Sequence, residues 1–296
     1  MRTTIHIFGL APLLGLATSF APFIGEQDFT AEQKALVDTH CPYGLPSSDN
    51  VLVRQGYVAA YDPDRRIPLW AAYHAHPDYR PAPERKSRVK SFRKDPDVTN
   101  AVVDDDYNGL LSSRGFARGH LAPYFIMGGD RNDSGLGANR TGESDEHDEK
   151  TVFQANFMSN IAPQHHLGFN GGSGVWYEVE TYIREKVVDK GWEAHVIAGC
   201  VLGPKSMEKV GPDGDIEVPP AFFQIVSFPT EEGDYPIVLA FLLPHHRIAH
   251  GDPEDFLVSV DVIEALTGLN FFSELDDDFE EWIEGVDTFE NWEGDE

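Results

Sequence analysis

The chain has 296 residues, of which 41% are hydrophobic and 25% charged, and its formal net charge is −27. This length can bury a substantial core in one large domain or two small ones. The sequence has no repeat of about 20–50 residues, which argues against a solenoid. So negative a chain repels polyanions at long range, and composition alone therefore argues against nucleic acid as a partner.

The first residues have the layout of a secretory signal peptide. Arg2 precedes an apolar stretch from Ile5 to Leu16, and small residues follow it. This order predicts a signal peptide over residues 1–22, a secreted or periplasmic protein, and no membrane attachment of the mature form. Pro12 interrupts the apolar stretch, so a membrane anchor and a buried N-terminal helix are the alternatives. Residues 23–43 are assigned to a leader that precedes the folded domain.

The chain contains two cysteines, Cys41 and Cys200. In an oxidising compartment they can form one disulfide. Two unpaired thiols fit the sequence equally well, so both states stay open.

Runs of β-branched and aromatic residues bounded by turns predict an antiparallel sheet. The first two strands are expected to pair through the turn "DPDRR" at 62–66. The segments expected to form strands are 51–62, 68–76, 151–163, 194–203, 221–228 and 235–244. Helical spacing of apolar residues predicts helices at 174–191 and at 259–272, the latter ending at Gly268. The sequence therefore indicates an α+β fold with a central antiparallel sheet.

Charge is distributed unevenly along the chain. Residues 80–94 hold seven basic residues and one acidic residue, which fits either a solvated loop or a local anion-binding segment. Residues 128–150 are rich in Gly, Asn, Asp and Ser and are expected to form a long exposed loop. Residues 276–296 form an acidic tail. This tail is either a solvated appendage or a segment that folds back onto the basic residues and competes with a ligand.

The segment "ARGHLAP" (117–123) carries an arginine, a glycine and a histidine at a predicted strand. A second strand ends near Asn160, and a polar turn with Asn170 leads into the helix at 174–191. Two strands and a helix in this order can close into a ββα unit. Such a unit suits phosphodiester hydrolysis, because a neutral histidine can deprotonate water and a hard cation can neutralise phosphate charge. Mg²⁺ keeps most of its waters, so one Asn oxygen can suffice as its protein ligand.

Several motifs occur in the order found in one known family. They are "YDPDRRIPLWAAYHA", "SFRKDP", "ARGHLAP", "FMSNIAPQ", "GFN", "VWYEVE" and "SVDVIEALTGLNFF". With these motifs, residues 44–275 resemble the DNA/RNA non-specific endonucleases, the endonuclease G-like ββα-metal (His-Me finger) nucleases. The resemblance implies a Mg²⁺-dependent endonuclease that cuts both DNA and RNA, with Mn²⁺ as a substitute ion. A homodimer is compatible with the sequence.

The resemblance also implies a role for individual residues. His120 is the general base that activates water, and Asn170 is the sole protein ligand of the hydrated Mg²⁺. Arg118 supports the site, and Asn160 holds the histidine or the metal waters by hydrogen bonding. Arg88 falls where the family has an arginine that steadies the phosphate.

Three positions leave alternatives open. Arg93 is the rival of Arg88, because the spacing of loop residues is poorly fixed by sequence. The spacing between Asn170 and Trp176 is longer than the family's usual one, so counting from Asn170 selects Glu178 as the acid that orients the metal waters. Counting from Trp176 selects Glu180, which we prefer because a glycine-rich insertion leaves the helix register intact.

The sequence also departs from the family at Ala117, where the family usually has Asp. We expect reduced or retuned activity from this change. The alternative function is a weakened or inactive member that binds nucleic acid or protein, and a third is a phosphodiesterase of small nucleotides. A zinc site at His165–His166 and His245–His246 is disfavoured, because adjacent strand residues point to opposite faces.

Overall fold

A computed structural model describes residues 29–80, 91–137, 145–203, 208–230 and 235–286. The predicted signal peptide (1–22), most of the basic segment with Arg88, and the end of the acidic tail lie outside these residues. In the described part of the chain, none of the helices is both long and apolar enough to cross a membrane.

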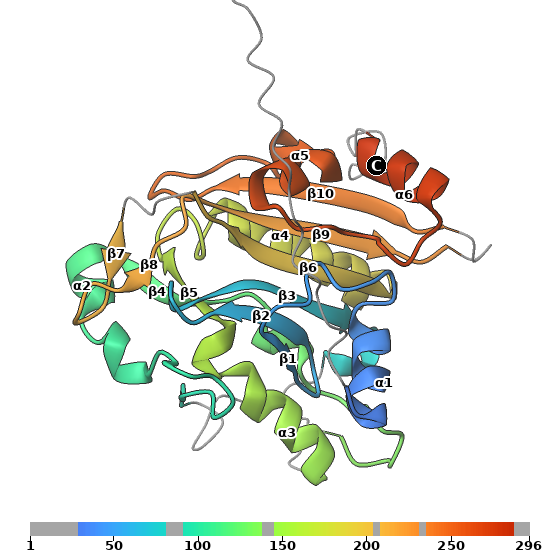
Figure 1. Ribbon diagram of the computed structural model, residues 1–296, viewed down its shortest axis with the longest axis horizontal. Helices are drawn as coiled ribbons and strands as arrows, with labels where there is room; N and C mark the ends of the chain where they lie inside the picture. The colour runs from blue at the N-terminus through green and yellow to red at the C-terminus, as the bar shows by residue number, and fades with distance from the viewer. Residues whose placement is uncertain (1–28, 81–90, 138–144, 204–207, 231–234, 287–296) are drawn as a thin grey trace, which may run out of the picture.

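The centre of the fold is a seven-stranded antiparallel sheet, with the strand order β1-β2-β3-β6-β9-β10-β11 (Figure 1). Its strands are β1 (Val51–Val53), β2 (Val58–Asp62), β3 (Ile67–Ala75), β6 (Ala194–Val201), β9 (Ala221–Phe228), β10 (Ile237–Pro244) and β11 (Leu257–Val258). The predicted α+β fold with an antiparallel sheet is thus confirmed. Five of the six predicted strands lie in this sheet, although the first of them is divided into β1 and β2.

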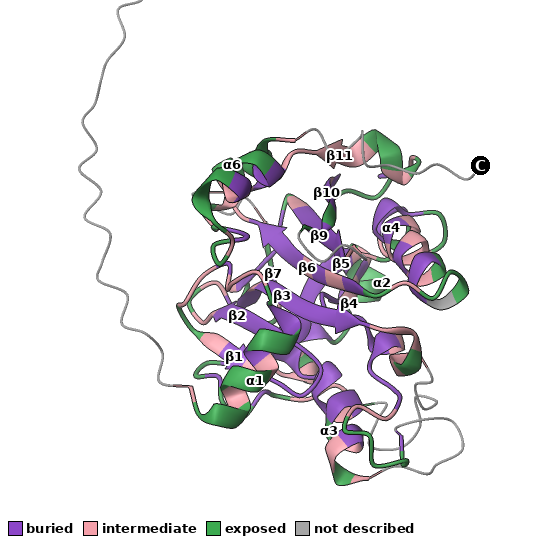
Figure 2. Cartoon of the chain, turned by 90° about the vertical axis from the view of Figure 1, so that its right-hand side faces the viewer, coloured by how far each residue is buried: buried purple, intermediate pink, exposed green. Residues whose placement is uncertain are grey.

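Alternation along the strands separates two hydrophobic cores. In β3, Tyr73 and Ala75 face one core, while Trp70 and Ala72 face the other. The Tyr73 core is closed by α4 (Val175–Arg184) and by the segment Leu121–Met127. The Trp70 core is closed by three helices, namely α1 (Ala31–His40), α5 (Val260–Thr267) and α6 (Asp277–Gly285). The central strands are therefore buried on both faces, as Figure 2 shows.

Both predicted helices form. The first is α4, continued by a π-helical turn at Glu185–Asp189, and its buried residues include Val175, Trp176, Val179 and Ile183. The second is α5, which ends at Gly268 with a φ of 73°. A side chain is strained at that left-handed φ, so the glycine explains why the helix stops there.

The predicted strand at 151–163 is wrong for most of its length. Residues Glu146–Ala155 form the helix α3, and the strand β5 covers Ile161–His165 alone. The Asp145 side chain accepts a hydrogen bond from the Asp148 backbone, and acidic residues fill the first turn. These are helix-starting signals, and a short apolar run cannot distinguish a strand from a buried helix. The predicted exposed loop 128–150 is accordingly shorter, because α3 begins within it and Asp148 is buried.

The remaining elements are short. They are η1 (Pro77–Tyr79), η3 (Asp104–Tyr107), α2 (Leu110–Arg114), β4 (Phe116–His120), η4 (Tyr124–Ile126), η5 (Met158–Asn160), β7 (Lys209–Val210), β8 (Ile216–Glu217) and η7 (Pro253–Phe256). Of these, β4 pairs with β5 in a separate two-stranded sheet, and β7 pairs with β8 in another.

Parts of the leader and of the acidic tail belong to the folded domain. Val37 of α1 packs in the Trp70 core. In α6, Ile283 is buried in the same core, and the Phe279 ring stacks on Tyr235 with centroids 3.4 Å apart. Leu121 and Ala122, which directly follow His120, lie in the other core. The helical part of the tail therefore packs on the opposite side of the central sheet from the segment after His120.

Cys41 and Cys200 are free thiols. Cys41 belongs to the Trp70 core and Cys200 to the Tyr73 core. Burial raises the pKa of both thiols. Of the two states that the sequence leaves open, the structure has the unpaired one.

Candidate active site

The predicted ββα unit forms around the RGH segment. Strand β4 pairs antiparallel with β5, and His120, the last residue of β4, is the register partner of Ile161. The chain then turns through Asn170 into α4. Trp176 of α4 packs against Phe169 with ring centroids 5.9 Å apart, which ties the start of the helix to the turn. The fold thus brings the histidine strand, the Asn170 turn and the helix together.

The ring of His120 is held by Asn156. Only 9% of His120 is exposed, and its Nε2 lies 2.9 Å from Oδ1 of the buried Asn156. Because Oδ1 can only accept, Nε2 donates, and the ring proton is on that nitrogen. Nδ1 then carries the lone pair that can accept a proton. The ring of Phe92 lies beside the imidazole, with centroids 5.5 Å apart.

Asn160 supports the backbone after His120 and does not hold the ring. Its Oδ1 accepts from the Ala122 backbone at 2.9 Å, and its Nδ2 donates to the carbonyls of Ala122 and Ala155, also at 2.9 Å. These bonds fasten the segment after β4 to the end of α3. The hydrogen bond to the histidine that we expected from Asn160 is made by Asn156.

Arg118 lies close to His120 and is fixed by Asp104. Its Nε is 2.6 Å from Asp104 Oδ1, and one of its terminal nitrogens donates to the Asp104 carbonyl at 2.8 Å. Its guanidinium carbon lies 5.5 Å from the centre of the Phe92 ring, which also contacts His120. Arg118 and the histidine therefore share one aromatic neighbour.

Arg88 lies outside the described residues, and its rival Arg93 is directed toward α3. The Arg93 guanidinium donates to the Phe153 carbonyl and lies 3.8 Å from the centre of the Phe153 ring. The segment around it is anchored by Asp95, whose two carboxylate oxygens accept from one terminal nitrogen of the buried Arg54 at 2.6 and 2.7 Å. This anchor fixes the segment that places Phe92 next to His120.

Asn170 is oriented by Gln164 of β5. The Nδ2 atom of Asn170 donates to the side-chain oxygen of the buried Gln164, which leaves Asn170 Oδ1 as the remaining polar atom of that amide. Gly119 leaves the room for this pair, because a Cβ at that position would overlap the Gln164 side chain. The glycine next to His120 is therefore needed for the packing of the residue that orients Asn170.

The amide oxygen of Asn170 fits a hard cation. Amide oxygen is a ligand that Mg²⁺ accepts, and Mg²⁺ retains several waters when it has few protein ligands. Within the described ranges, three groups of His, Asp and Glu side chains are close enough to share an ion, and neither His120 nor Asn170 belongs to any of them. Asn170 is thus the candidate metal ligand next to the RGH segment.

Glu180 faces the same side of α4 as Trp176. The indole Nε1 of Trp176 donates to Glu180 Oε1 at 3.0 Å, and Trp176 is buried against Phe169, the neighbour of Asn170. Glu178 lies half a turn away on the helix and is half-buried. The structure therefore connects Glu180 to the Asn170 turn through Trp176.

His245, one of the histidines considered for zinc, has backbone partners for both ring nitrogens. The His165 backbone donates to His245 Nε2 at 2.9 Å, and His245 Nδ1 lies 2.7 Å from the Pro219 carbonyl. Both nitrogens of His245 are therefore used within the fold.

Comparison with known proteins decides the family. The profile of the DNA/RNA non-specific endonucleases matches residues 37–278. The chain belongs to the DNA/RNA non-specific endonuclease family.

Several individual members of the family are similar to this chain. Human mitochondrial nuclease EXOG is 26% identical over 272 residues, which cover 85% of this chain and 64% of EXOG. Nuclease C1 of Cunninghamella echinulata var. echinulata is 28% identical over 250 residues, covering 79% of this chain and 87% of C1. The chain spans 60–64% of the length of the EXOG proteins from mouse, human and Xenopus laevis.

The fold also resembles a solved member of the family. The crystal structure of the EndoG/EndoGI complex superimposes with a TM-score of 0.63 at 22% identity, covering 81% of this chain and 92% of that one. The likeness supports the family assignment at the level of the fold.

Ala117, which replaces the usual aspartate of the family, does not lie beside the His120 ring. Ala117 is the register partner of Gln164, whereas His120 is the partner of Ile161. An aspartate at 117 would therefore lie next to the Gln164 amide, since cross-strand partners share a face. The change from the family pattern thus affects the surroundings of the Asn170 partner.

Sequence reasoning missed two residues that orient the candidate site. Gln164 is the last residue of the quoted motif "FMSNIAPQ", so a closer reading of that motif could have selected it. Asn156 directly precedes this motif, and no pattern in the sequence singles it out. Its role depends on the end of α3, where the predicted secondary structure was wrong.

Replacing Asn156 by alanine is expected to lower kcat by roughly 5- to 150-fold, because a buried donor left without its acceptor costs about 1–3 kcal/mol. Steady-state cleavage of a fluorescent oligonucleotide measures this loss. The matched variant Asn156→Asp keeps an acceptor and adds a negative charge that stabilises the imidazolium. The acidic limb of its pH–activity profile should therefore lie at a higher pH than that of the parent. Unchanged kcat in a folded Asn156→Ala protein would show that the bond does not position the base.

Proposed function

We propose that this protein is a Mg²⁺-dependent endonuclease that hydrolyses phosphodiester bonds in both DNA and RNA. The observation that carries the proposal is the pairing of two oriented groups in one ββα unit. Asn156 directs the proton of His120 to Nε2, and Gln164 leaves the oxygen of Asn170 available. A base and an oxygen ligand on adjoining strands and turns are what metal-assisted hydrolysis requires.

His120 removes a proton from the attacking water through Nδ1, while Nε2–H stays bonded to Asn156. The imidazolium that forms keeps that bond, because both of its ring nitrogens are donors. Asn170 would hold the metal ion through Oδ1. A bound Mg²⁺ neutralises charge on the phosphate and on the departing oxygen.

Arg88 is proposed as the residue that steadies the phosphate. It precedes Phe92 by four residues, and Phe92 lies against His120. The competing Arg93 is occupied with Phe153, which favours Arg88. Arg118 adds a positive charge next to the histidine, and Glu180 is proposed to orient the metal waters from α4.

The charge of the chain does not prevent this function. Repulsion in about 0.1 M salt extends roughly 10 Å, so charges near the site matter more than the total of −27. Helix α6, which carries part of the acidic tail, packs in the Trp70 core on the far side of the sheet from Leu121. At the site itself the charge of Arg118 is balanced by Asp104, its partner at 2.6 Å.

We further propose that the protein is exported. The basis is the sequence of residues 1–22, which has the order of a signal peptide. N-terminal sequencing of the mature protein tests this proposal, since export predicts loss of these residues.

A plasmid-nicking assay tests the proposed function. The full chain in Mg²⁺ is expected to convert supercoiled plasmid to nicked and linear forms and to degrade RNA, and EDTA should stop both reactions. Binding of DNA without cleavage in Mg²⁺ or Mn²⁺ would identify the inactive binding protein instead. Cleavage of a dinucleotide but not of plasmid would identify a phosphodiesterase of small nucleotides.

A further inference from the structure

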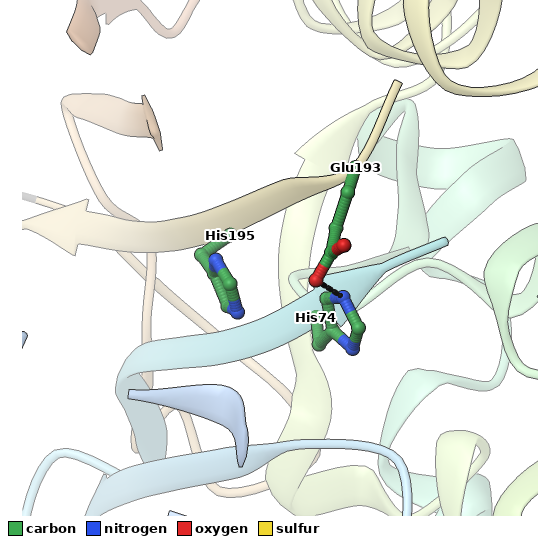
Figure 3. Close-up of side chains that lie close together, drawn as sticks. All are labelled: His74, Glu193 and His195. Atoms are coloured by element: carbon green, nitrogen blue, oxygen red, sulfur yellow. Dashed lines mark ion pairs between the residues drawn. The ribbon is translucent and has the colours of Figure 1, made fainter. Parts of the chain in front are cut away.

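A second cluster of metal-binding side chains lies at the end of strands β3 and β6. His74 of β3 and His195 of β6 are direct register partners. Their rings are stacked, with centroids 4.8 Å apart and an angle of 15° between the planes. Glu193, just before β6, places Oε1 2.6 Å from His74 Nε2 (Figure 3).

This cluster is separate from the proposed nuclease site. Along β3, His74 follows Trp70 and Ala72 at alternate positions, so it lies on the face of the sheet covered by α1, α5 and α6. The ββα unit contributes Leu121 and Trp176 to the core on the other face. A ligand at His74 would therefore not take part in phosphodiester cleavage.

The histidines of the cluster have nitrogens without hydrogen-bond partners. Only 8% of His74 is exposed. Its Nε2 is paired with Glu193 Oε1 at 2.6 Å, whereas its Nδ1 is buried with no hydrogen-bond partner among the described residues. Nδ1 of His195 is likewise buried without a partner in that part of the chain. Buried polar atoms are normally paired, so these nitrogens indicate a missing partner.

Burial favours the neutral form of both histidines. Burial, with further contributions from Arg131 and His76, lowers the pKa of His74 to about 4. Burial and the neighbouring His74 lower the pKa of His195 to about 4 as well. Neutral imidazoles have lone pairs, and the neutral form is the one that binds metal ions.

We propose that His74, His195 and Glu193 bind one Zn²⁺ ion. One ligand atom from each of the three residues lies within 4.8 Å of the other two. Zinc at about 2.0–2.1 Å from each ligand requires neighbouring ligand atoms roughly 3.3 Å apart in a tetrahedron. The ligand atoms lie within 4.8 Å of one another, with Glu193 Oε1 2.6 Å from His74 Nε2, so small shifts in both directions would complete the site. Glu193 can make that movement, because its side chain is 45% exposed and precedes the strand. Two imidazoles and a carboxylate select Zn²⁺ over Mg²⁺ and Ca²⁺, which prefer oxygen.

The surroundings of the cluster support a metal site. His195 is hydrogen-bonded to the Thr39 backbone, as metal-binding histidines commonly are through their second nitrogen. His40 uses Nδ1 to accept from the His74 backbone at 3.1 Å and Nε2 on the Gln55 carbonyl at 3.1 Å, so it holds the strand and is not a ligand. The positive charge of Arg131 disfavours cation binding at His74. The carboxylate of Glu193, which lies 2.6 Å from His74 Nε2, counteracts that repulsion.

The other two clusters of the described residues fit zinc less well. Asp145, His147 and Asp148 include one imidazole, and both carboxylates already accept backbone hydrogen bonds. Asp261, Glu264 and Glu284 offer carboxylates alone. His147 therefore provides a matched control for the proposed site.

Equilibrium dialysis of the full chain without a histidine tag tests the proposal, with Zn²⁺ as the probe. The parent and His147→Gln should bind one Zn²⁺ per chain at this site. Glu193→Gln should bind it at least about tenfold more weakly, and His195→Asn should lose it. Co²⁺ in place of Zn²⁺ should give the intense visible absorption of a tetrahedral site in the parent, and not in His195→Asn.

Melting temperature supplies a second measurement. Zn²⁺ should raise the Tm of the parent and of His147→Gln and leave that of His195→Asn unchanged. Glu193 is at the surface, so Glu193→Gln is expected to fold. It therefore tests the site even if the buried variant His195→Asn does not fold. Absence of Zn²⁺ binding by the parent would overturn the site, and so would binding as tight as the parent's by both Glu193→Gln and His195→Asn. Neither measurement depends on nuclease activity, so this result is independent of the proposed function.

Discussion

His120→Ala is expected to lower plasmid cleavage by about 10²–10⁴-fold, the usual loss when a general base is removed. In the proposed mechanism the ring is the group whose Nδ1 accepts the proton of water, and alanine provides no substitute. Rates are measured at saturating Mg²⁺, so that a change in metal affinity does not contribute. Added imidazole should restore part of the activity, because the cavity left by the ring can admit it.

The matched control for this variant is His165→Ala. His165 lies at the opposite end of the same hairpin, where it pairs with Phe116 and stacks on its ring with centroids 4.4 Å apart. Its loss should change stability more than activity. Circular dichroism and thermal unfolding verify that both variants fold. A folded His120→Ala protein that cleaves at the parental rate would eliminate His120 as the base.

The pH dependence follows from the same role. Only the neutral imidazole accepts a proton, so cleavage should rise with pH through the pKa of His120 and then level off. The Asn156→Asp variant should displace that rise toward higher pH, whereas His165→Ala should not. A profile without an acidic limb would contradict catalysis by a histidine base.

The sheet was predictable because its strands carry strong local signals. Segments such as 221–228 and 235–244 combine β-branched and aromatic residues with clear turns, and they form β9 and β10. The segment 151–163 failed because its apolar residues fit a buried helix as well as a strand. Val152 and Ala155 pack in the Tyr73 core, and this tertiary packing stabilises the segment as the helix α3.

The candidate site was predictable to the extent that it lies in continuous motifs. His120, Arg118 and Asn170 come from such segments, and the fold brings their strands and turn into one unit. Partners that meet only in space could not be found in this way. Asn156 reaches His120 from 36 residues further along the chain, and it does so from the end of a helix that the sequence did not predict.

The same reasoning explains the ends of the domain. Charge predicted an acidic tail from residue 276, but Phe279 and Ile283 recur at helical spacing within it. This apolar face lets α6 pack on the Trp70 core despite its acidic residues. Net charge describes how a segment interacts with water and ions, whereas periodicity decides whether it joins the fold.

Asn170→Ala is expected to raise the Mg²⁺ concentration needed for half-maximal cleavage by at least about tenfold and to lower the maximal rate by about a hundredfold or more. In the proposed site a single neutral oxygen anchors the ion, so its removal would leave water and substrate phosphate as the ligands. A bound metal supplies several kcal/mol of charge stabilisation, and each 1.4 kcal/mol is about a factor of ten in rate. Titration of Mg²⁺ in the plasmid assay measures both quantities.

Two further variants make the Asn170 result specific. Asn170→Asp keeps an oxygen ligand and adds a negative charge, so it should reach half-maximal activity at a lower Mg²⁺ concentration than Asn170→Ala. Asn108→Ala removes an exposed asparagine whose side chain bonds Asp105 at 2.9 Å, and it should leave the Mg²⁺ titration unchanged. If Asn170→Ala titrates like the parent, the metal ligand is another residue. In that case the Gln164–Asn170 hydrogen bond would serve only to pack the turn before α4.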